Sequence, residues 1–461
     1  MKRTNEGAVA YEHSLNHALE FFSKAGSLFT NRRSFYGHEE SALSLFQKTW
    51  IVDPELSFKL LLWLRDCRGG SGNRSATREC LSWLGKNDPE WVNANIGWIP
   101  MVGRWDDLRA LFGTQCEEYA VKMWASALRE KDVLAAKWAD RNDSPLRKEM
   151  GMKIGDFRRL LAKIRKDHIV EHKMCTKRWN EVEYEKVPSV AMARYTQAFN
   201  RNDEARFQRY KEALKSGEAK VHADVLFPHD CVRTVKGGDA EIADAQFDAL
   251  PNFMEGTDER IIVISDTSGS MSVQLAGSIR AVDVSQGLAL YCSSRIPEGN
   301  PFHKKFIAFC SESKFKDWEG MRFSEAVRNR RIFDGAIGST RVDTALDLIL
   351  DTAKFFSLGN GHMPTTLLIV SDMQFHQGAR SRETEIERSL KKWDNAGYAR
   401  PKVVYWNTAG YSGSQDTAKS KDIGLVSGFS PSVLKAILGG EKFDPISIMM
   451  RAIEKYDVVV P

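Results

Sequence analysis

The sequence lacks long apolar segments and is poor in proline. Its longest mainly apolar run, residues 58–64, is far shorter than the roughly 18 to 20 residues that a membrane-spanning helix needs. The first residues lack the apolar core of a secretory signal. With 14 Pro and 33 Gly in 461 residues, the composition is that of a globular protein. We therefore expect no membrane association and a cytoplasmic location, which would be the host cytoplasm if the protein is viral.

Cysteine is scarce and scattered. The seven cysteines are odd in number and none forms a CxxC pair, so the pattern favours neither a disulfide framework nor a zinc ribbon. We expect each to be a small, buried apolar residue in a reducing compartment. HExxH is absent, and the glycine-rich residues 69–75 lack the GK[ST] of a phosphate-binding loop.

Net charge is also small, at +5, but it is unevenly distributed. Residues 151–220 contain 17 Lys and Arg against 10 Asp and Glu. Most such runs are solvated faces, yet here the basic residues recur at helical spacings, which also favours a stripe that neutralises phosphates. Trp105 and Trp179 could add base stacking, although tryptophans in helical arrays are more often core residues. The candidate nucleic-acid contacts are Arg158, Arg159, Lys163, Lys166, Lys173 and Arg178.

The N-terminal half reads as helix after helix. Apolar residues recur at threes and fours from residue 15 to about residue 214, and short breakers such as Asp53-Pro54 separate the runs. Helix pairs of about 40 residues suggest a HEAT-like repeat array, although the self-similarity is weak. We predict an all-α domain over residues 1–228, followed by a surface connector over residues 229–257, where glycine and acidic residues are frequent.

From residue 258 onward the pattern changes to strands alternating with helices. Continuous apolar strands in this alternation predict a doubly wound, parallel α/β sheet of Rossmann-like type over residues 258–461. Ligands bind such sheets at the carboxyl ends of the strands. The predicted strands are residues 261–265, 305–310, 365–372, 402–407 and 423–427, and the predicted helices are 276–294, 342–356, 382–396, 431–438 and 445–456.

Three oxygen-bearing side chains follow the first of these strands. Asp266, Ser268 and Ser270 occupy alternate positions, and Gly269 lets the backbone turn between them. Oxygen ligands suit a hard divalent cation such as Mg²⁺ better than the metals that prefer thiolate or imidazole. A metal held mainly by hydroxyls keeps coordination positions for water or for an oxygen of another molecule. The pattern therefore favours a recognition site.

Catalysis fits the same residues less well. A phosphotransferase of the haloacid-dehalogenase type also places its nucleophilic Asp after an apolar strand, but it requires a second Asp two positions later, where Ser268 stands. No general acid near Asp266 is evident in the sequence. We expect the protein not to be an enzyme.

Motifs distributed over nearly the whole chain resemble those of the TROVE-vWA proteins. They are RDCRGGSGNR (65–74), IPMVGRWDDL (99–108), VPSVAMARY (187–195), SDTSGSMS (265–272), GST (338–340), SDMQF (371–375) and SGFSP (427–431). The likeness is greatest to bacterial and bacteriophage members of that group. It implies a helical ring closed by a von Willebrand factor A (vWA) domain, with structured RNA bound outside and single-stranded ends within. By the same resemblance, Thr340 and Asp372 complete a metal-ion-dependent adhesion site with Asp266, Ser268 and Ser270.

Two functions therefore stay open at this point. The first is a non-enzymatic, monomeric RNA-binding protein of the Ro type that carries a divalent-metal vWA site. The second is a protein-interaction adaptor whose metal grips an acidic residue of a partner, such as an AAA+ ATPase or a phage or virion component. Arg341, which follows Thr340, is expected either to screen the metal or to contact a phosphate.

Overall fold

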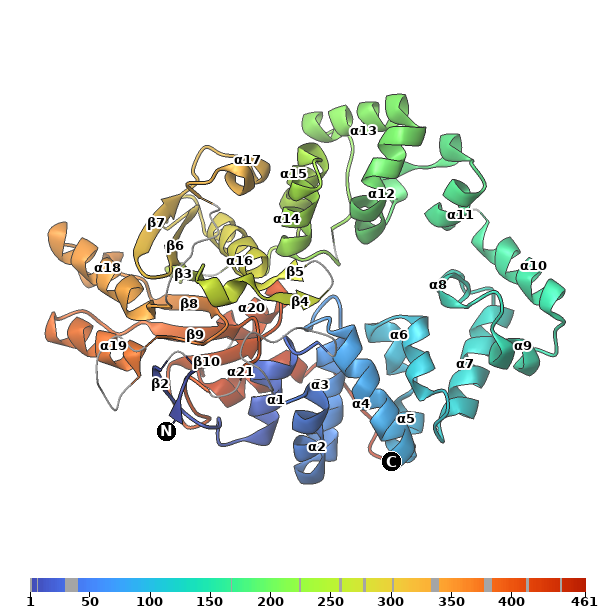
Figure 1. Ribbon diagram of the computed structural model, residues 1–461, viewed down its shortest axis with the longest axis horizontal. Helices are drawn as coiled ribbons and strands as arrows, with labels where there is room; N and C mark the ends of the chain where they lie inside the picture. Colours follow the sequence, from blue (N-terminus) through green and yellow to red (C-terminus); the bar gives the residue numbers. More distant parts are fainter. Residues whose placement is uncertain are drawn as a thin grey trace.

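The structure, a computed structural model, describes residues 2–5, 7–29, 40–166, 168–223, 225–256, 259–276, 279–300, 302–332, 340–376, 384–411, 414–439 and 442–461. A helical part is followed along the chain by a part built on a six-stranded sheet (Figure 1). Gly338 and Ser339 of the GST motif lie outside the described residues. None of the helices in the described ranges is long and apolar enough to cross a membrane.

The helical part forms an arc of short helices. Their lengths range from 5 to 14 residues, and the HEAT-like repeat organisation remains a prediction. The helices are α1 (His17–Ala25), α2 (Ala42–Val52), α3 (Pro54–Arg65), α4 (Arg74–Asn87), α5 (Pro89–Asn95), α6 (Trp98–Val102), α7 (Glu117–Arg129), α8 (Val133–Trp138), α9 (Ser144–Glu149), α10 (Ile154–Arg165), α11 (Val170–Cys175), α12 (Ser189–Asn202), α13 (Glu204–Ser216), α14 (Pro228–Lys236) and α15 (Ala240–Asp248). The 3-10 segments are η1 (Trp105–Leu111), η2 (Trp179–Glu181) and η3 (Tyr184–Lys186).

Local sequence explains where several of these helices begin. The Asp53 carboxylate accepts the Leu56 backbone N–H at 2.9 Å and caps α3, whose first residue is Pro54. In the same way, the Asn73 side chain accepts the Ala76 N–H at 3.2 Å and caps α4. The glycine-rich segment therefore connects helix α3 to the start of helix α4, whereas a phosphate-binding loop follows a strand.

The second part is an α/β unit. Its strands are β3 (Ile261–Asp266), β6 (Lys305–Phe309), β7 (Ser313–Asp317), β8 (Thr366–Ser371), β9 (Lys402–Asn407) and β10 (Ile423–Ser427). Its helices are α16 (Ala281–Arg295), α17 (Phe323–Arg328), α18 (Val342–Phe355), α19 (Glu385–Asn395), α20 (Leu434–Leu438) and α21 (Pro445–Ile453), with 3-10 segments η4 (Gly269–Ser272), η5 (Asn360–His362) and η6 (Pro431–Val433). Two small antiparallel pairs are β1 (Lys2–Arg3) with β2 (Val9–Ala10), and β4 (Gln274–Ala276) with β5 (Ile279–Arg280).

The strand order is β10-β9-β8-β3-β6-β7, and only β7 runs antiparallel to its neighbour. The predicted α/β unit with mainly parallel strands is thus confirmed. After β3 the chain passes to β6 on one side and later returns to β8 on the other. The carboxyl ends of β3 and β8 therefore form the topological switch point, where α/β sheets bind ligands.

Three stretches differ from the sequence prediction. The predicted surface connector, residues 229–257, carries most of α14 and all of α15, with Cys231 and Phe247 buried. The glycine and acidic residues there belong to helix ends, as when Asp239 caps α15. The helix predicted from residue 276 begins only at residue 281, because β4 and β5 precede it. Strand β7 was missed because its sequence, SKFKD, contains a single apolar residue and the strand lies at a sheet edge.

The arc contacts the α/β unit at both of its ends (Figure 1). At the start, α1 packs against β10, where the Gly26 N–H donates to Ser427 Oγ at 3.1 Å and that hydroxyl donates to the Phe22 carbonyl at 2.6 Å. At the other end, α14 packs against α16. The C-terminal tail adds reciprocal 2.8 Å hydrogen bonds between Asn95 and the Val459 backbone. The helical part therefore closes on the sheet into a ring.

The seven cysteines are all free. Four of them are buried, as predicted for small apolar residues. Cys67 and Cys310 are half-buried and Cys175 is exposed, so the expectation of burial is wrong for Cys175.

Candidate metal edge and basic cavity

Three of the predicted metal ligands lie at the ends of neighbouring strands. Asp266 is the last residue of β3, and Asp372 directly follows β8, the strand paired with it. Thr340 lies beside the end of β6, because the next residue, Arg341, donates its N–H to the Cys310 carbonyl at 3.1 Å. We call the region formed by Asp266, Ser268, Ser270, Thr340 and Asp372 the metal edge. The fold brings the three segments that carry these residues to one edge of the sheet.

Hydrogen bonds hold the carboxylates of the metal edge in place. Asp266 Oδ1 accepts the Ser268 N–H at 2.8 Å, and Asp266 Oδ2 accepts the Ser371 hydroxyl at 2.5 Å. The Ser268 and Ser270 hydroxyls bond each other at 3.2 Å. Asp372 Oδ1 accepts the Gln374 N–H at 3.1 Å. Ser371 is a supporting residue that sequence reasoning missed, although it lies within the SDMQF motif.

The electrostatics of the metal edge suit a cation. Burial raises the pKa of Asp266 to about 6, although bonds from Ser371 and Ser268 oppose this rise. Within the described ranges no Lys or Arg forms an ion pair with Asp266. The Thr340 hydroxyl is buried, and its oxygen finds no hydrogen-bond partner among the residues described. A buried carboxylate and an unused hydroxyl oxygen are the donors that a hard cation would take.

The donor set of the metal edge is unusual in having only two carboxylates. The described part of the chain contains no group of three or more His, Cys, Asp or Glu side chains that could hold a metal ion. A cation at this edge would therefore depend on the oxygens of Ser268, Ser270 and Thr340. Such a cation would keep coordination positions for water or for an oxygen of another molecule.

Two neighbours shape the position of Thr340. His376 Nδ1 accepts the Thr340 N–H at 2.7 Å, and the His376 N–H donates to the Thr340 carbonyl at 2.8 Å. Between Asp372 and His376, Met373 adopts a left-handed backbone with φ of 63°, a strained conformation that is common at functional sites. Arg341 turns toward Asp343, with bonds of 2.8 and 2.9 Å, so its side chain is already engaged by that carboxylate.

The closed arc encloses a second candidate site, a cavity of about 680 Å³. Its wall comes from the α3–α4 loop, the α6–η1 turn, α8, α11, the start of α12 and β4. Leu134 and Val190 expose apolar surface on this wall. The charged lining residues are Arg65, Arg68, Arg74, Arg104, Lys137 and Arg194, opposed only by Glu171. Arg65, Arg104 and Lys137 form ion pairs with Asp107, Asp106 and Glu171, so the excess of positive charge on the wall of this basic cavity comes from Arg68, Arg74 and Arg194.

The GRWDDL motif builds part of the cavity wall. Asp107 is fully buried and accepts hydrogen bonds from Arg65 Nε and Arg78 Nε, both at 2.7 Å. Asp106 pairs with Arg104 at 3.1 Å. A side chain at Gly103 would collide with Asp107 Oδ2 at 2.4 Å, which explains the glycine. The two acids lie behind the wall and fix the arginines that face the cavity.

Arg104 also lies on an aromatic ring. Its guanidinium carbon is 3.8 Å from the centroid of the Trp138 ring, which is a close cation–π contact. Trp105 lines the same cavity and packs against Trp124, so its predicted role in base stacking stays open. Trp179 instead packs against Phe199 in a separate small core. A flat cation on a flat ring is a surface on which a base can stack.

The RGGSGN and SGFS motifs meet at the joint between the arc and the sheet. Ser71 Oγ donates to the Gly26 carbonyl at 3.2 Å, and Ser432 Oγ donates to the Gly70 carbonyl at 3.3 Å. Gly428 has φ of 100° and would place a Cβ 2.8 Å from Ser71 Oγ. These motifs therefore close the ring, and their glycines allow the two segments to approach.

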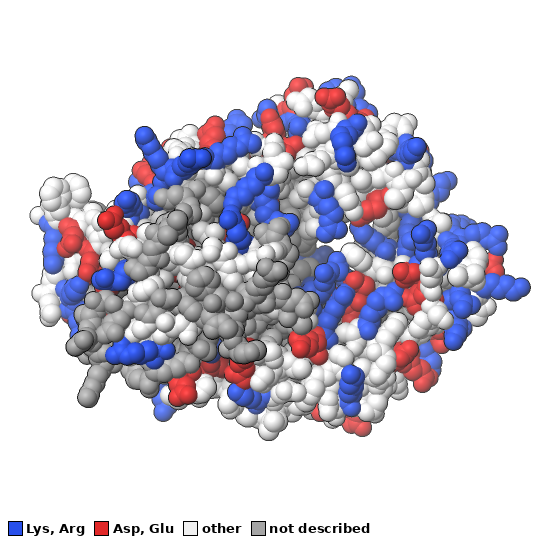
Figure 2. All heavy atoms as spheres, in the orientation of Figure 1, with Lys and Arg blue, Asp and Glu red and all other residues white. Residues whose placement is uncertain are grey.

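The six predicted nucleic-acid contacts lie outside the cavity and divide into two groups. Arg158, Arg159, Lys163 and Lys166 are exposed along α10, opposite its buried face. We call these four residues the outer stripe. Arg158 bonds the Asn142 side chain and Arg159 pairs with Asp156. Figure 2 shows Lys and Arg both around a hollow in the right half of the molecule and at its right edge, where α10 lies.

Lys173 and Arg178 form the second group, and both are engaged in local bonds. Lys173 Nζ donates to the Glu181 carbonyl at 2.9 Å, and Arg178 pairs with the Glu181 carboxylate at 2.7 Å. Their local charge is therefore partly neutralised. The cavity cations were missed because they are spread over 130 residues and never form a run; the motifs RDCRGG and GRWDDL were the available signal.

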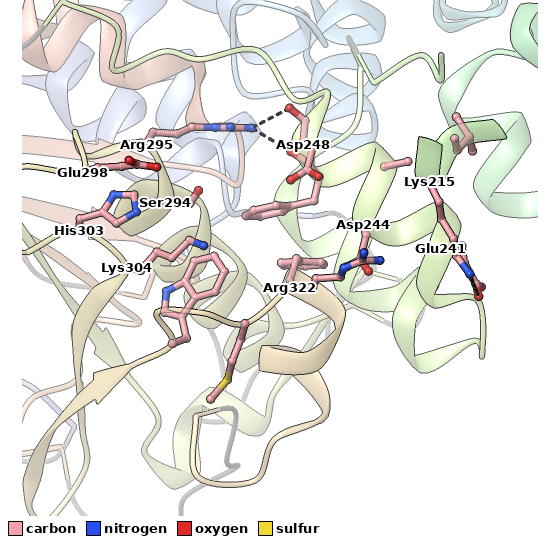
Figure 3. A pocket seen from close by; sticks show the side chains of 16 residues that line it. Lys215, Glu241, Asp244, Asp248, Ser294, Arg295, Glu298, His303, Lys304 and Arg322 are labelled. Carbon is pink, nitrogen blue, oxygen red and sulfur yellow. Dashed lines mark hydrogen bonds and ion pairs between the residues drawn. The ribbon is translucent and has the colours of Figure 1, made fainter. Parts of the chain in front are cut away.

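A further pocket, of about 420 Å³, lies between α13, α15, the end of α16 and the start of α17 (Figure 3). Its charges are balanced, and Arg295 is occupied with the Phe247 and Asp248 carbonyls at 2.9 and 3.2 Å. Its charged residues are Lys215, Arg295, Lys304 and Arg322 against Glu241, Asp244, Asp248 and Glu298. Unlike the basic cavity, it offers no excess charge to a polyanion.

The comparisons with known proteins agree with this architecture. A crystal structure of the Ro (RSR) protein of Deinococcus radiodurans matches with a TM-score of 0.51 at 12% sequence identity, over 95% of this chain and 99% of that one. The fold is therefore Ro-like. At the level of sequence, the model of the domain of unknown function DUF2828 matches residues 4–116 and 135–263, more than half of the chain, and the chain belongs to that family.

Two further similarities include the C-terminal part, and the second covers nearly the whole chain. The domain of unknown function DUF7788 matches residues 260–457, which include the whole sheet and the metal edge. Uncharacterized protein L728 of Acanthamoeba polyphaga mimivirus is 27% identical over 516 residues, covering 98% of this chain and 87% of the viral protein. The resemblance to vWA domains rests on the motifs and the strand-end geometry.

Proposed function

We propose that this protein is a non-enzymatic, Ro-type RNA-binding protein that takes a single-stranded segment of RNA into the basic cavity. The observation that carries this proposal is the cavity wall inside the closed ring, which is lined by six cations and one acid and where Arg68, Arg74 and Arg194 form no ion pair with the described residues. The Arg104–Trp138 pair supplies a stacking surface beside those cations. RNA combines phosphates with flat bases. In this proposal the cations bind the phosphates and the Arg104–Trp138 pair stacks on a base.

The Ro-like fold supports the proposal, because the TROVE-vWA motifs and the overall fold point to the same group. In this proposal the helical part, including α14 and α15, binds RNA, and its helix pairs are HEAT-like. The outer stripe on α10 contributes phosphate contacts to structured RNA outside the ring. The part from β3 onward is a vWA domain.

The metal edge forms the second half of the proposal. Asp266, Ser268, Ser270, Thr340 and Asp372 would hold Mg²⁺ or a similar divalent cation, and the buried Asp266 and the unused Thr340 oxygen support this. When bound, the cation supplies an electrophilic position for an oxygen of another molecule. The residues themselves orient that position, because Ser371 and the Ser268 N–H fix both oxygens of Asp266.

Salt dependence tests RNA binding directly. Each phosphate contact on a single strand releases counterions, so six contacts give a slope of about −4 in log affinity against log salt. Between 50 and 200 mM salt, the affinity for a 3′-tailed RNA should fall about 300-fold, as measured by filter binding. A blunt duplex of the same length is the control and should compete poorly. Salt-insensitive binding would favour the adaptor function, in which the metal edge grips a partner's carboxylate.

A further inference from the structure

A short segment connects the metal edge to the wall of the basic cavity. Ser270 lies in η4, and β4 begins four residues later at Gln274. Leu275 in β4 is fully buried and belongs to the cavity wall. Only four residues therefore separate a proposed metal ligand, Ser270, from Leu275 on the surface proposed to contact RNA.

This segment is held firmly along its length. The Val273 N–H donates to the Ser270 carbonyl at 3.2 Å, and the Ala281 N–H donates to the Val273 carbonyl at 3.1 Å. Strand β4 pairs with β5, and Met271 is fully buried. A segment fixed by packing and hydrogen bonds shifts as a unit, because packed elements do not deform continuously.

The last residue of the hairpin, Arg280, lies opposite Gln274 and is linked to the helical arc through Asp283. Arg280 in β5 forms an ion pair with the Asp283 carboxylate at 3.2 Å, and Lys236 of α14 forms a second ion pair with the same carboxylate at 2.6 Å. Helix α14 follows Val225, another residue of the cavity wall. The β4–β5 hairpin thus lies between the metal edge and the arc, as its place beside α16 in Figure 1 shows.

We propose that the metal edge and the basic cavity are coupled through the β4–β5 hairpin, so that a divalent cation at the edge changes the affinity of the cavity for single-stranded RNA. The inference rests on the proposed function. In the structure the Ser268 and Ser270 hydroxyls bond each other, and engaging both with a cation exchanges that bond and shifts η4. Leu275 moves with η4 and reshapes the cavity wall.

Thermodynamic linkage makes the proposal quantitative. If a cation changes RNA affinity by some factor, RNA must change cation affinity by the same factor, and such factors are typically about 5 to 150. The probe is a fluorescent oligo(U), which has no fold for Mg²⁺ to stabilise. Its dissociation constant is measured by anisotropy with EDTA and with saturating Mg²⁺, at constant ionic strength. The reciprocal arm measures Mg²⁺ affinity by calorimetry with and without oligo(U).

We expect the same factor of at least about fivefold in both arms for the parent protein. In Asp266→Asn the effect of Mg²⁺ on oligo(U) affinity should disappear. This result would distinguish Mg²⁺ bound at the metal edge from Mg²⁺ that only screens charge in solution. Leu275→Ala should bring the factor close to one. Leu134→Ala is the matched control, because Leu134 also lines the cavity but belongs to α8, and its factor should equal the parent's.

Leu275 is buried, so Arg280→Gln serves as a second variant. Arg280 is exposed, and replacing it loosens the hairpin's anchorage without opening the core, which should also lower the factor. A factor of one in the parent, with both ligands binding, would overturn the coupling and leave the proposed function intact. Absence of oligo(U) binding at low salt would overturn both. An unequal effect in the two arms would show that Mg²⁺ acts elsewhere.

Discussion

The α/β unit and the helical arc both bury a carboxylate at their candidate sites, but among the described residues only the one in the arc is paired with arginines. At the metal edge, the carboxylate of Asp266 is fully buried and the described residues bring no cation to it. In the arc, the buried Asp107 and the partly exposed Asp106 lie behind arginines that face a cavity. An uncompensated buried carboxylate favours a cation, whereas cations held in front of acids favour an anion. The proposed function therefore assigns the cation and the polyanion to two distinct sites.

Breaking the charge network of the arc should have the largest effect. Asp107→Ala leaves Arg65 and Arg78 without their buried partner, and losing one member of a buried ion pair costs about 3 to 5 kcal/mol of unfolding free energy. Chemical denaturation measures this. Asp106→Ala is the control, because Asp106 is more exposed, and it should cost about 1 to 2 kcal/mol. Equal losses would mean that Asp107 has no special role in the wall.

The pH dependence of the metal edge should be the next largest effect. Burial raises the folded-state pKa of Asp266 to about 6 from 3.8. The unfolding free energy of the metal-free protein therefore falls as the pH rises from about 4 to about 6, because the buried carboxyl must then ionise. The difference is about 3 kcal/mol. Metal-free Asp266→Asn should therefore be at least as stable as the parent at pH 7.5 and should lose this advantage at pH 4.5.

Mg²⁺ sharpens that test. It should raise the Tm of the parent at pH 7.5, where Asp266 is charged, and have little effect at pH 4.5. Asp266→Asn should show no shift at either pH in calorimetric scans. An equal shift in both proteins at pH 7.5 would place the cation elsewhere.

The smallest effect compares the cavity with the outer stripe, at equal change of charge. Replacing Arg68, Arg74 and Arg194 by Ala should flatten the salt slope for oligo(U) by about 2 units, since each contact contributes about 0.7. Replacing Arg159, Lys163 and Lys166 should leave oligo(U) affinity within about fivefold of the parent. It should weaken binding of structured RNA more. The reverse result would indicate that single-stranded RNA binds along α10 and not in the cavity.

The sequence contained enough to predict the α/β unit and its most informative loop. Strands such as β3 and β8 are continuous apolar runs because both faces are covered, and their ends are marked by Asp266 and Asp372. Strand β7 escaped because it is a short edge strand whose one apolar residue, Phe315, is exposed. Helices α14 and α15 escaped because each has only 9 residues and polar ends.

The functional surface of the arc was harder to predict. The outer stripe stood out because its cations share one helix, where spacing alone reveals a face. The cavity cations come from loops and helices between residues 65 and 194, and nothing in their local pattern distinguishes them. Lys173 and Arg178 remain predicted phosphate contacts, and both also bond Glu181.

By itself, then, the sequence determined the order of elements, the helix caps and the oxygen-rich loop after β3, because each depends on residues a few positions apart. Only the tertiary structure decided that Ser71 meets Gly428, that the arc closes, and that Arg104 and Arg194 line the same cavity. The physical reason is that periodicity and capping act over one or two turns. Ring closure depends on packing between segments hundreds of residues apart, which no local pattern encodes.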